Sequence, residues 1–517
     1  MKKYFGLLSA MLFSMSYASA HVTEKDIFSK AECPSNLECH FFKAPKDYNN
    51  PKGEMVDIYY GVHKATRPDK RKGVLFLNFG GPCAPAVRGA SVLASDYFPK
   101  EVVESFDIVG MDPRGSGFSA FAKELTRCAN SNKGCDKTFE KVSPFMGTNS
   151  VARDMDILRE ILGEEQINYL GFSYGTRLGS IYTDLFPDRV RAVILDANMS
   201  PFDTENEMVN IGRSGTSNDI FNFIYGSGAE KKMLHVVKDA FYHDGYLSQD
   251  NYLLNEFDTS VVLLLSLFQS KEPLIQMANA FFFQSDMFFF YHFIANLGES
   301  MEDEDIQVDK TMFDYPLPKA LANKKQLLRD FMFNNKEEEE QNRSMAMFQS
   351  VMCTDEPLDV LTDEDEIFEL YKEASELYGL PMHYLFNGMC RNWKAKKDPI
   401  VQLDAETMEA KLGDKKVLLY GIQYDTNTPY FWSQHMQEGF GDNAVLVTVD
   451  NIVRHCISFI FPKFDCVNDI ALNYLLNPNA DYQDTYCEFS ESMHSVVPLK
   501  SPKYDFPLEY TSISLIR

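Results

Sequence analysis

The chain has 517 residues and a formal net charge of −25 at pH 7. This length allows about three domains of ordinary size. The acidic balance excludes nucleic acid and anionic lipid surfaces as main partners, because both bind through a cationic surface. We interpret the excess charge as a solvated exterior.

The N-terminus has the order of residues found in secretory signal peptides. Two lysines precede an apolar run that ends near Met15, and Ala18–Ala20 supplies small residues for cleavage before His21. The run is shorter than the roughly 20 apolar residues that a membrane-spanning helix needs. We therefore expect an exported protein, periplasmic or extracellular, with no membrane span. The oligomeric state stays open.

Ten cysteines are present, and in an exported chain they favour disulfides over metal ligands. The sequence has no CxxC pair and no HExxH motif, so we expect no metal and no cofactor. The connectivity stays open, since ten cysteines allow on the order of a thousand pairings. Several cysteines fall into close pairs, which gives four candidates, Cys33 with Cys39, Cys128 with Cys135, Cys353 with Cys390 and Cys466 with Cys487.

Continuous apolar runs bounded by glycine or charge predict buried strands. From about residue 55 to 200 these runs alternate with helical patterns, and the same signature returns late in the chain. Such alternation is typical of an α/β fold with a mostly parallel sheet and helices on both faces. The predicted strands are Val74–Leu77, Phe106–Val109, Ile167–Leu170, Ala192–Leu195, Val417–Tyr420 and Ala444–Val449, and the predicted helices are Val151–Leu162 and Thr176–Phe186.

The middle of the chain changes in character. Residues 201–404 are helical in pattern, acidic and aromatic, with dense phenylalanines in residues 281–293 that we expect to form the core of a lid. We therefore predict one α/β core with a large, mainly helical insertion. The expected parts are a signal peptide (1–20), the first part of the core (21–200), a helical lid or substrate domain (201–404) and the second part of the core (405–517).

Gly171–Gly175 reads GFSYG and matches G-x-S-x-G. Such a sharp strand-to-helix turn holds a serine hydroxyl clear of the backbone, and its glycines relieve crowding. The pentapeptide alone has a high false-positive risk. Here a predicted strand enters the turn and a predicted helix leaves it, with its positive dipole end at the turn. We predict that Ser173 is a nucleophile.

A nucleophilic serine needs donors for the negative charge that develops on the substrate oxygen. Asn78–Pro82 reads NFGGP and follows the predicted strand Val74–Leu77. A glycine-rich turn at this place can aim backbone N–H groups at that charge. We expect the N–H groups of Gly81 and Tyr174 to form the oxyanion hole. The alternative is an ordinary Gly-Gly-Pro turn.

The acid and the base should follow the serine in the chain order Ser, Asp, His. Asp425 lies in the loop after the strand Val417–Tyr420, and His455 lies in the loop after Ala444–Val449. Open α/β sheets place their sites at such strand ends. Asp450 is a rival acid on the loop of the histidine itself. Among the other histidines, we expect His435 in a helix and His494 in a tail.

Several motifs together resemble the secreted tripeptidyl aminopeptidases, α/β hydrolases related to proline iminopeptidases. The resemblance covers roughly residues 70–200 and 350–490. It implies an acyl-enzyme on Ser173, with His455 as the base and Asp425 as its orienting acid, and peptide substrates with a free N-terminus. The motifs are GGP near residue 80, Asp112–Ser119, Val151–Asp156, Tyr169–Thr176, Asp425–Pro429 and the late cysteines Cys466 and Cys487.

The chain departs from that family's pattern in two loops. Cys83 replaces a glycine after Gly-Gly-Pro, and Cys456 follows the histidine where the family commonly has a glycine. Both loops are expected at the site, so we predict a Cys83–Cys456 disulfide. The alternative is two separate, buried and inert thiols.

The resemblance also places acids near the cleft after Cys353. Asp355 and Glu356 are our candidates for holding the substrate ammonium group, although most acids in such a chain are only solvated. Three functions remain open: an exopeptidase for free N-termini, which we favour, a carboxylic-ester hydrolase with the same triad, and a binding protein that only retains the fold.

Overall fold

A computed structural model of the chain describes residues 33–131, 134–201, 246–247, 253–254, 335–356, 390, 393–425, 427–461 and 464–489. The predicted signal peptide (1–20) and the phenylalanines of residues 281–293 lie outside these ranges, as does most of the predicted lid. The domain boundaries therefore stay predictions. Among the described residues, we find no helix that combines the length and the apolar character needed to span a membrane.

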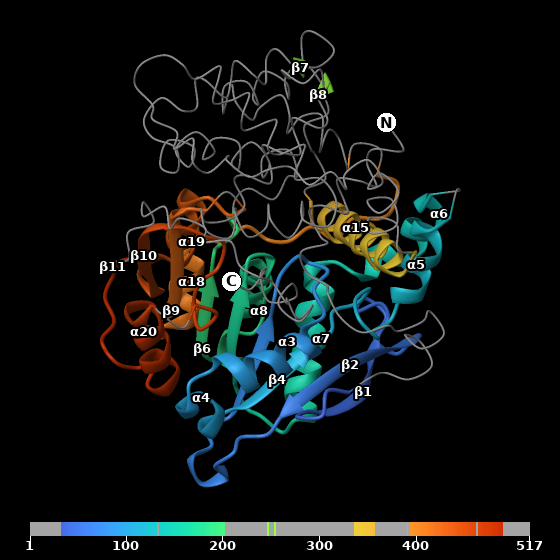
Figure 1. Cartoon of the computed structure of the whole chain (residues 1–517). Coiled ribbons are helices and arrows are strands. Elements are labelled where there is room, and N and C mark those ends of the chain that lie inside the picture. The colour runs from blue at the N-terminus through green and yellow to red at the C-terminus, as the bar shows by residue number, and fades with distance from the viewer. Residues whose placement is uncertain are drawn as a thin grey trace, which may run out of the picture.

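A mixed sheet forms the centre of the described structure (Figure 1). Its nine strands have the order β1-β2-β4-β3-β5-β6-β9-β10-β11. The β1–β2 and β2–β4 pairs are antiparallel, and all other neighbours in this sheet are parallel. The strands are β1 (Glu38–Pro45), β2 (Met55–His63), β3 (Val74–Asn78), β4 (Asp107–Met111), β5 (Ile167–Phe172), β6 (Val190–Asp196), β9 (Val417–Tyr424), β10 (Ala444–Val453) and β11 (Thr485–Glu488), and a separate short pair is β7 (Tyr246–Leu247) with β8 (Leu253–Leu254).

The six strands predicted from apolar runs are present as β3, β4, β5, β6, β9 and β10. Their successive side chains alternate between two hydrophobic clusters, so that Tyr169 joins one and Leu170 the other. Both faces of these strands are covered, so the residues that point to either face are apolar. The apolar runs in the sequence are therefore continuous. The sequence analysis did not identify the hairpin β1–β2, whose outer strand has exposed residues at four of its eight positions.

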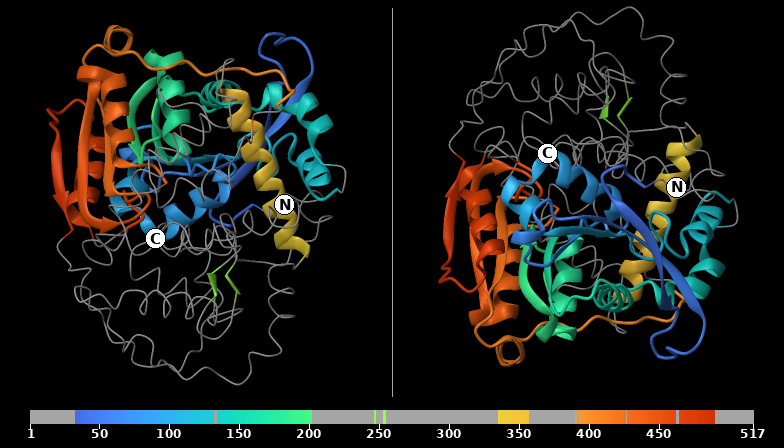
Figure 2. Two further views of the ribbon diagram at one scale, coloured as in Figure 1. Left: turned by 90° about the horizontal axis from the view of Figure 1, so that it is seen from above. Right: turned by 90° about the horizontal axis from the view of Figure 1, so that it is seen from below.

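Helices cover the two faces of the sheet as separate layers (Figure 2). Helices α7, α8, α18 and α19 contribute side chains to the first cluster, whereas α4 and α20 contribute to the second. The fold is the α/β fold expected from the sequence. The helices are α3 (Ala86–Val92), α4 (Lys100–Ser105), α5 (Ala122–Ala129), α6 (Asp136–Val142), α7 (Thr148–Ile161), α8 (Tyr174–Leu185), α15 (Asn335–Asp355), α18 (Ala405–Leu412), α19 (Tyr430–Phe440) and α20 (Asp465–Leu476).

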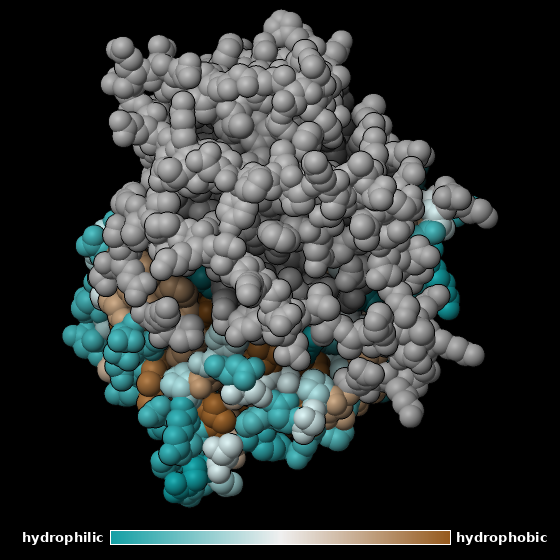
Figure 3. Space-filling view, viewed as in Figure 1, coloured by the Kyte–Doolittle hydropathy of each residue, from teal (hydrophilic) through white to brown (hydrophobic). Residues whose placement is uncertain are grey.

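The described surface on the face shown in Figure 3 is largely hydrophilic, with smaller hydrophobic areas between the polar ones. Phe41 on β1 and Tyr486 on β11 are among the large apolar side chains that remain about half exposed. Isolated apolar residues of this kind are normal on protein surfaces.

The Asp112–Ser119 motif ties the outer hairpin to the helix layer through Arg114. This fully buried guanidinium forms an ion pair with Asp154 of α7, at 2.7 Å between Nε and Oδ2. It also donates to the carbonyl oxygens of Pro45 and Phe145. A buried charge is tolerated when all its donors are satisfied in this way. Part of this motif is therefore structural.

The four candidate cysteine pairs are disulfides in the structure. They join Cys33 to Cys39, Cys128 to Cys135, Cys353 to Cys390 and Cys466 to Cys487, with Cα–Cα distances from 4.9 to 5.9 Å. These distances lie in the range usual for disulfides.

The predicted disulfide between Cys83 and Cys456 is wrong. Both residues are buried thiols, and they pack on opposite faces of the sheet. Cys83 belongs to the cluster under α7 and α8, and Cys456 to the cluster under α4 and α20. The alternative of two separate buried thiols holds instead. Burial raises the pKa of the Cys456 thiol well above its ordinary value, which keeps it protonated and unreactive.

Candidate active site

Ser173 lies in the turn between β5 and α8, at the centre of the sheet. Its backbone has φ 57° and ψ −124°, a conformation that costs about 1–3 kcal/mol for a residue with a Cβ. The turn is held by Ser173 N–H, which donates to the Asp196 carbonyl at 2.9 Å, and by Thr176 N–H, which donates to the Ser173 carbonyl at 2.8 Å. This is the strand–turn–helix context predicted for the pentapeptide.

The glycines on either side of the serine are required by space. A Cβ on Gly171 would lie 2.4 Å from the carbonyl oxygen of Gly175, and a Cβ on Gly175 would lie 2.8 Å from the carbonyl oxygen of Asn78. Both contacts are with backbone atoms that cannot turn aside. The G-x-S-x-G pattern therefore reflects close packing of this strand-to-helix turn, the serine elbow, on itself and on the end of β3.

Asp425 and His455 form a hydrogen-bonded pair at the C-terminal ends of β9 and β10. The distance from His455 Nδ1 to Asp425 Oδ2 is 2.8 Å. The aspartate side chain is 1% exposed and the histidine 19% exposed. The imidazole can therefore reach a substrate while the carboxylate behind it stays out of water. A pairing of this kind orients the ring and stabilises its protonated form.

The loop after β9 holds Asp425 with its own donors. Asp425 Oδ1 accepts from the N–H groups of Asn427 at 2.8 Å and Thr428 at 3.2 Å, and Oδ2 accepts from Thr428 Oγ1 at 2.9 Å. Sequence reasoning did not single out Thr428. The residues Asp425–Pro429 are typical of an Asx-type turn, and this pattern could have indicated Thr428 as a partner of the aspartate.

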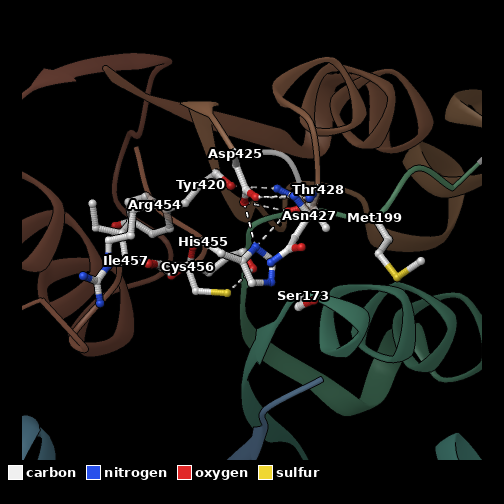
Figure 4. A network of polar contacts seen from close by, with 12 residues as sticks. Ser173, Met199, Tyr420, Asp425, Asn427, Thr428, Arg454, His455, Cys456 and Ile457 are labelled. Carbon is white, nitrogen blue, oxygen red and sulfur yellow. Dashed lines mark hydrogen bonds and ion pairs between the residues drawn. The ribbon is translucent and has the colours of Figure 1, made fainter. Parts of the chain in front are cut away.

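The structure brings these loops to the serine elbow. Figure 4 shows the His455 ring between Asp425 and Ser173, with the Ser173 side chain at the start of α8. The sulfur of Cys456, the residue after the histidine, is 4.0 Å from the carbonyl oxygen of Asp196, which also accepts from Ser173 N–H. The expected nucleophile, base and acid thus follow strands β5, β10 and β9, and β6 lies between β5 and β9 in the sheet. Their catalytic roles stay predictions.

The glycine-rich turn after β3 packs directly on the elbow. A Cβ on Gly80 would lie 2.6 Å from the Phe172 carbonyl oxygen and 3.1 Å from Tyr174 N. Gly80 N–H donates to Asn78 Oδ1 at 3.0 Å, so it is already engaged. The N–H groups of Gly81 and Tyr174 stay the predicted oxyanion donors.

The rival residues Asp450 and His435 have other hydrogen-bond partners. The Asp450 side chain accepts from Asn451 N–H at 2.6 Å and from the hydroxyl of Tyr486 on β11. His435 lies in α19, where Nδ1 is 3.1 Å from Ser200 Oγ. His494 is outside the described residues.

Asp355 and Glu356, the candidate amine anchors, are fully buried at the end of α15. Asp355 accepts from Thr148 N–H at 2.8 Å and from Thr148 Oγ1 at 2.5 Å. Thr148 Oγ1 is also 2.5 Å from the hydroxyl of Tyr174. Glu356 Oε2 is 3.4 Å from Lys397 Nζ. Thr148 therefore links Asp355 to the side chain of Tyr174, whose N–H group is an expected oxyanion donor. The sequence analysis did not predict this link.

Burial raises the pKa of Asp355 from 3.8 to about 7, although the bonds from Thr148 oppose the shift. Between these values the folded protein holds a proton that the unfolded chain releases, so folding stability falls as pH rises. We expect Asp355→Asn to remove this loss of folding stability at higher pH, because the neutral amide does not titrate and can keep both hydrogen bonds to Thr148. Relative to wild type, the variant should gain about 1–4 kcal/mol in unfolding free energy between pH 4 and pH 8.

Denaturant unfolding at both pH values measures this difference. Asp414→Asn, at an exposed residue, is the control and should show the same stability relative to wild type at both. An equal difference for Asp355→Asn at pH 4 and pH 8 would mean that the buried carboxyl does not titrate as expected.

Comparison with known proteins fits this geometry. Residues 88–240 match a family model described as alpha/beta hydrolase fold, and residues 378–487 match one described as TAP-like protein. Over 211 residues the chain is 31% identical to "Tripeptidyl aminopeptidase" of Streptomyces coelicolor, a match that covers 36% of this chain and 39% of the relative.

Two further relatives match over similar lengths. "Serine protease Hip1" of Mycobacterium tuberculosis is 32% identical over 199 residues, covering 33% of this chain and 38% of the relative. "Carboxylesterase B" of Mycobacterium tuberculosis is 34% identical over 190 residues, covering 32% and 36%. The matches thus span less than half the length of each relative. The chain is an α/β-hydrolase-fold protein with a TAP-like C-terminal section.

Proposed function

We propose that this protein is an exported serine hydrolase that releases short peptides or single residues from free peptide N-termini. The observation that carries the proposal is the His455–Asp425 hydrogen bond of 2.8 Å beside a serine held at positive φ. The relatives named tripeptidyl aminopeptidase and serine protease support the choice of peptide substrates. The four disulfides support export.

The proposed reaction is acyl transfer in two halves. His455 Nε2 takes the proton of the Ser173 hydroxyl as Oγ attacks the carbonyl carbon, and the N–H groups of Gly81 and Tyr174 bind the oxyanion. The imidazolium then gives its proton to the leaving amine as the C–N bond breaks. Water, activated by the same imidazole, hydrolyses the acyl-enzyme and restores the serine.

An exopeptidase must also hold the ammonium group of its substrate. Asp355 and Glu356 remain our proposal for this anchor, because a buried carboxylate gives a strong charge-assisted hydrogen bond. Both carboxylates already have partners, Thr148 and Lys397, so the amine would bind beside these groups. An unchanged peptide KM in Asp355→Ala and Glu356→Ala would remove the anchor and leave the rest of the proposal intact.

The test compares three substrates with mature, full-length protein: a tripeptidyl p-nitroanilide, its N-acetylated form and a short p-nitrophenyl ester. An exopeptidase should lose at least about 100-fold in kcat/KM when the amine is blocked, since its anchor is then left without a partner. A fluorophosphonate probe should label Ser173 in the same preparation. Absence of labelling in folded protein would overturn the serine-hydrolase proposal.

A carboxylic-ester hydrolase with the same triad is the second candidate, favoured by the likeness to "Carboxylesterase B". An esterase would cleave the acyl ester and would treat the free and the acetylated peptide alike. That result would replace the peptidase proposal while keeping Ser173, His455 and Asp425 in their roles.

A further inference from the structure

Asp196 is the last residue of β6, the strand between β5, which carries the serine elbow, and β9, which leads to Asp425. In register it lies beside Phe172 on β5 and Tyr420 on β9. Its side chain is fully buried. A buried carboxyl group is costly unless hydrogen bonds compensate it, so its partners indicate why it is there.

The backbone of Asp196 contacts the nucleophile. Its carbonyl oxygen accepts from Ser173 N–H at 2.9 Å, which continues the β5–β6 ladder into the elbow. The same carbonyl oxygen is 4.0 Å from the sulfur of Cys456. One peptide group thus touches the serine residue and the residue after the histidine.

The carboxyl group of Asp196 holds the other side of the site. Oδ2 accepts from Ile457 N–H at 3.0 Å, Ser458 N–H at 2.6 Å and Ser458 Oγ at 2.5 Å. These residues follow His455 almost directly. All three bonds end on one oxygen, and Asp196 Oδ1 has no hydrogen-bond partner among the described residues.

The turn that these bonds hold is conformationally strained. Cys456 and Phe459 both have φ 62°, in the left-handed region that residues with a Cβ rarely adopt. Such a turn persists only when its surroundings fix it. Asp196 supplies a strong acceptor inside the turn, between the two strained residues.

We infer that Asp196 is a positioning residue, which sets the place of the His455 imidazole relative to Ser173 by binding the histidine loop through its side chain and the serine through its backbone. This inference rests on the proposed serine-hydrolase function. Asp196 contacts neither substrate nor reacting atoms; its effect on the reaction passes through His455.

Asp196→Ala should lower kcat by about 100-fold, the cost typical of a misplacement of about 1 Å between reacting groups. KM should change less than about three-fold, because the substrate contacts remain. Asp196→Asn should keep kcat within about five-fold of wild type, since its amide oxygen can accept the same three bonds. Rescue by asparagine distinguishes a fixed acceptor from a general effect of charge.

Ser458→Ala removes only the side-chain bond and keeps the protein testable if Asp196→Ala does not fold. We expect kcat to fall by about three- to ten-fold with KM unchanged. The control is Asn198→Ala, at a buried polar residue that donates to Tyr420 O and Ser433 Oγ instead. It should leave kcat per labelled site as in wild type, whatever it does to stability.

Active sites are counted by fluorophosphonate labelling, and kcat and KM are measured per labelled site. Wild-type kcat in Ser458→Ala, or in a folded Asp196→Ala, would overturn the inference. So would an Asp196→Asn variant as slow as Asp196→Ala. If wild-type protein itself is not labelled, the proposed function fails first, and this outcome is distinct from the others.

Discussion

Ser173→Ala is expected to lower kcat by about 10⁴- to 10⁶-fold, with little change in KM or in the free energy of unfolding. The substitution removes the only atom that attacks the substrate in the proposed reaction. It leaves the elbow intact, because the bonds that hold the turn come from the backbone of Ser173. Initial rates on the preferred substrate and labelling by a fluorophosphonate probe measure the effect.

Ser180→Ala is the matched control on the same helix. Ser180 is buried, and its hydroxyl donates to the Arg177 carbonyl at 2.9 Å. This variant should retain activity within about three-fold. Activity within ten-fold of wild type in Ser173→Ala would mean that the elbow serine is not the nucleophile.

Asp425→Asn is expected to lower kcat by about 10³- to 10⁴-fold at neutral pH. The reason lies in the donors around the carboxylate. Asn427 N–H and Thr428 N–H both point at Oδ1, so an asparagine would keep its oxygen there and turn its NH₂ group toward His455 Nδ1. Nδ1 would then have to accept, which leaves the proton on Nε2, the atom that must take the proton of Ser173.

Asp450→Asn controls for the loss of one carboxylate near the site. Asp450 bonds to Asn451 and Tyr486 rather than to His455, so the variant should keep most of its activity. An Asp450→Asn variant that is as slow as Asp425→Asn would make Asp450 the orienting acid, contrary to the geometry. A pH–rate profile of both variants separates a wrong tautomer from a loss of folded protein.

Much of this site could be predicted from the sequence because its signals are local. The elbow needs a buried strand, a glycine, a serine, a second glycine and a helix, all within residues 167–185. Asp425 and His455 could be predicted because parallel strands end at the same edge of the sheet. Two of the four disulfides were predictable because only six or seven positions separate their partners.

Other features depended on contacts between distant parts of the chain. Cys83 and Cys456 both flank the site in sequence, but the path of each loop sends their side chains to opposite faces of the sheet. Thr148 and Asp355 are 207 residues apart and form two hydrogen bonds. The residues around them in the sequence therefore indicate neither that Cys83 and Cys456 stay apart nor that Thr148 pairs with Asp355.

The sequence by itself determined the strand–turn–helix elbow and the alternation of strands and helices, because each depends on residues close together in the chain. Only the tertiary structure decided that Asp196 holds the histidine loop, with partners 261 and 262 residues away. A hydrogen bond over that separation exists only once the order of strands β5, β6, β9 and β10 brings their ends together.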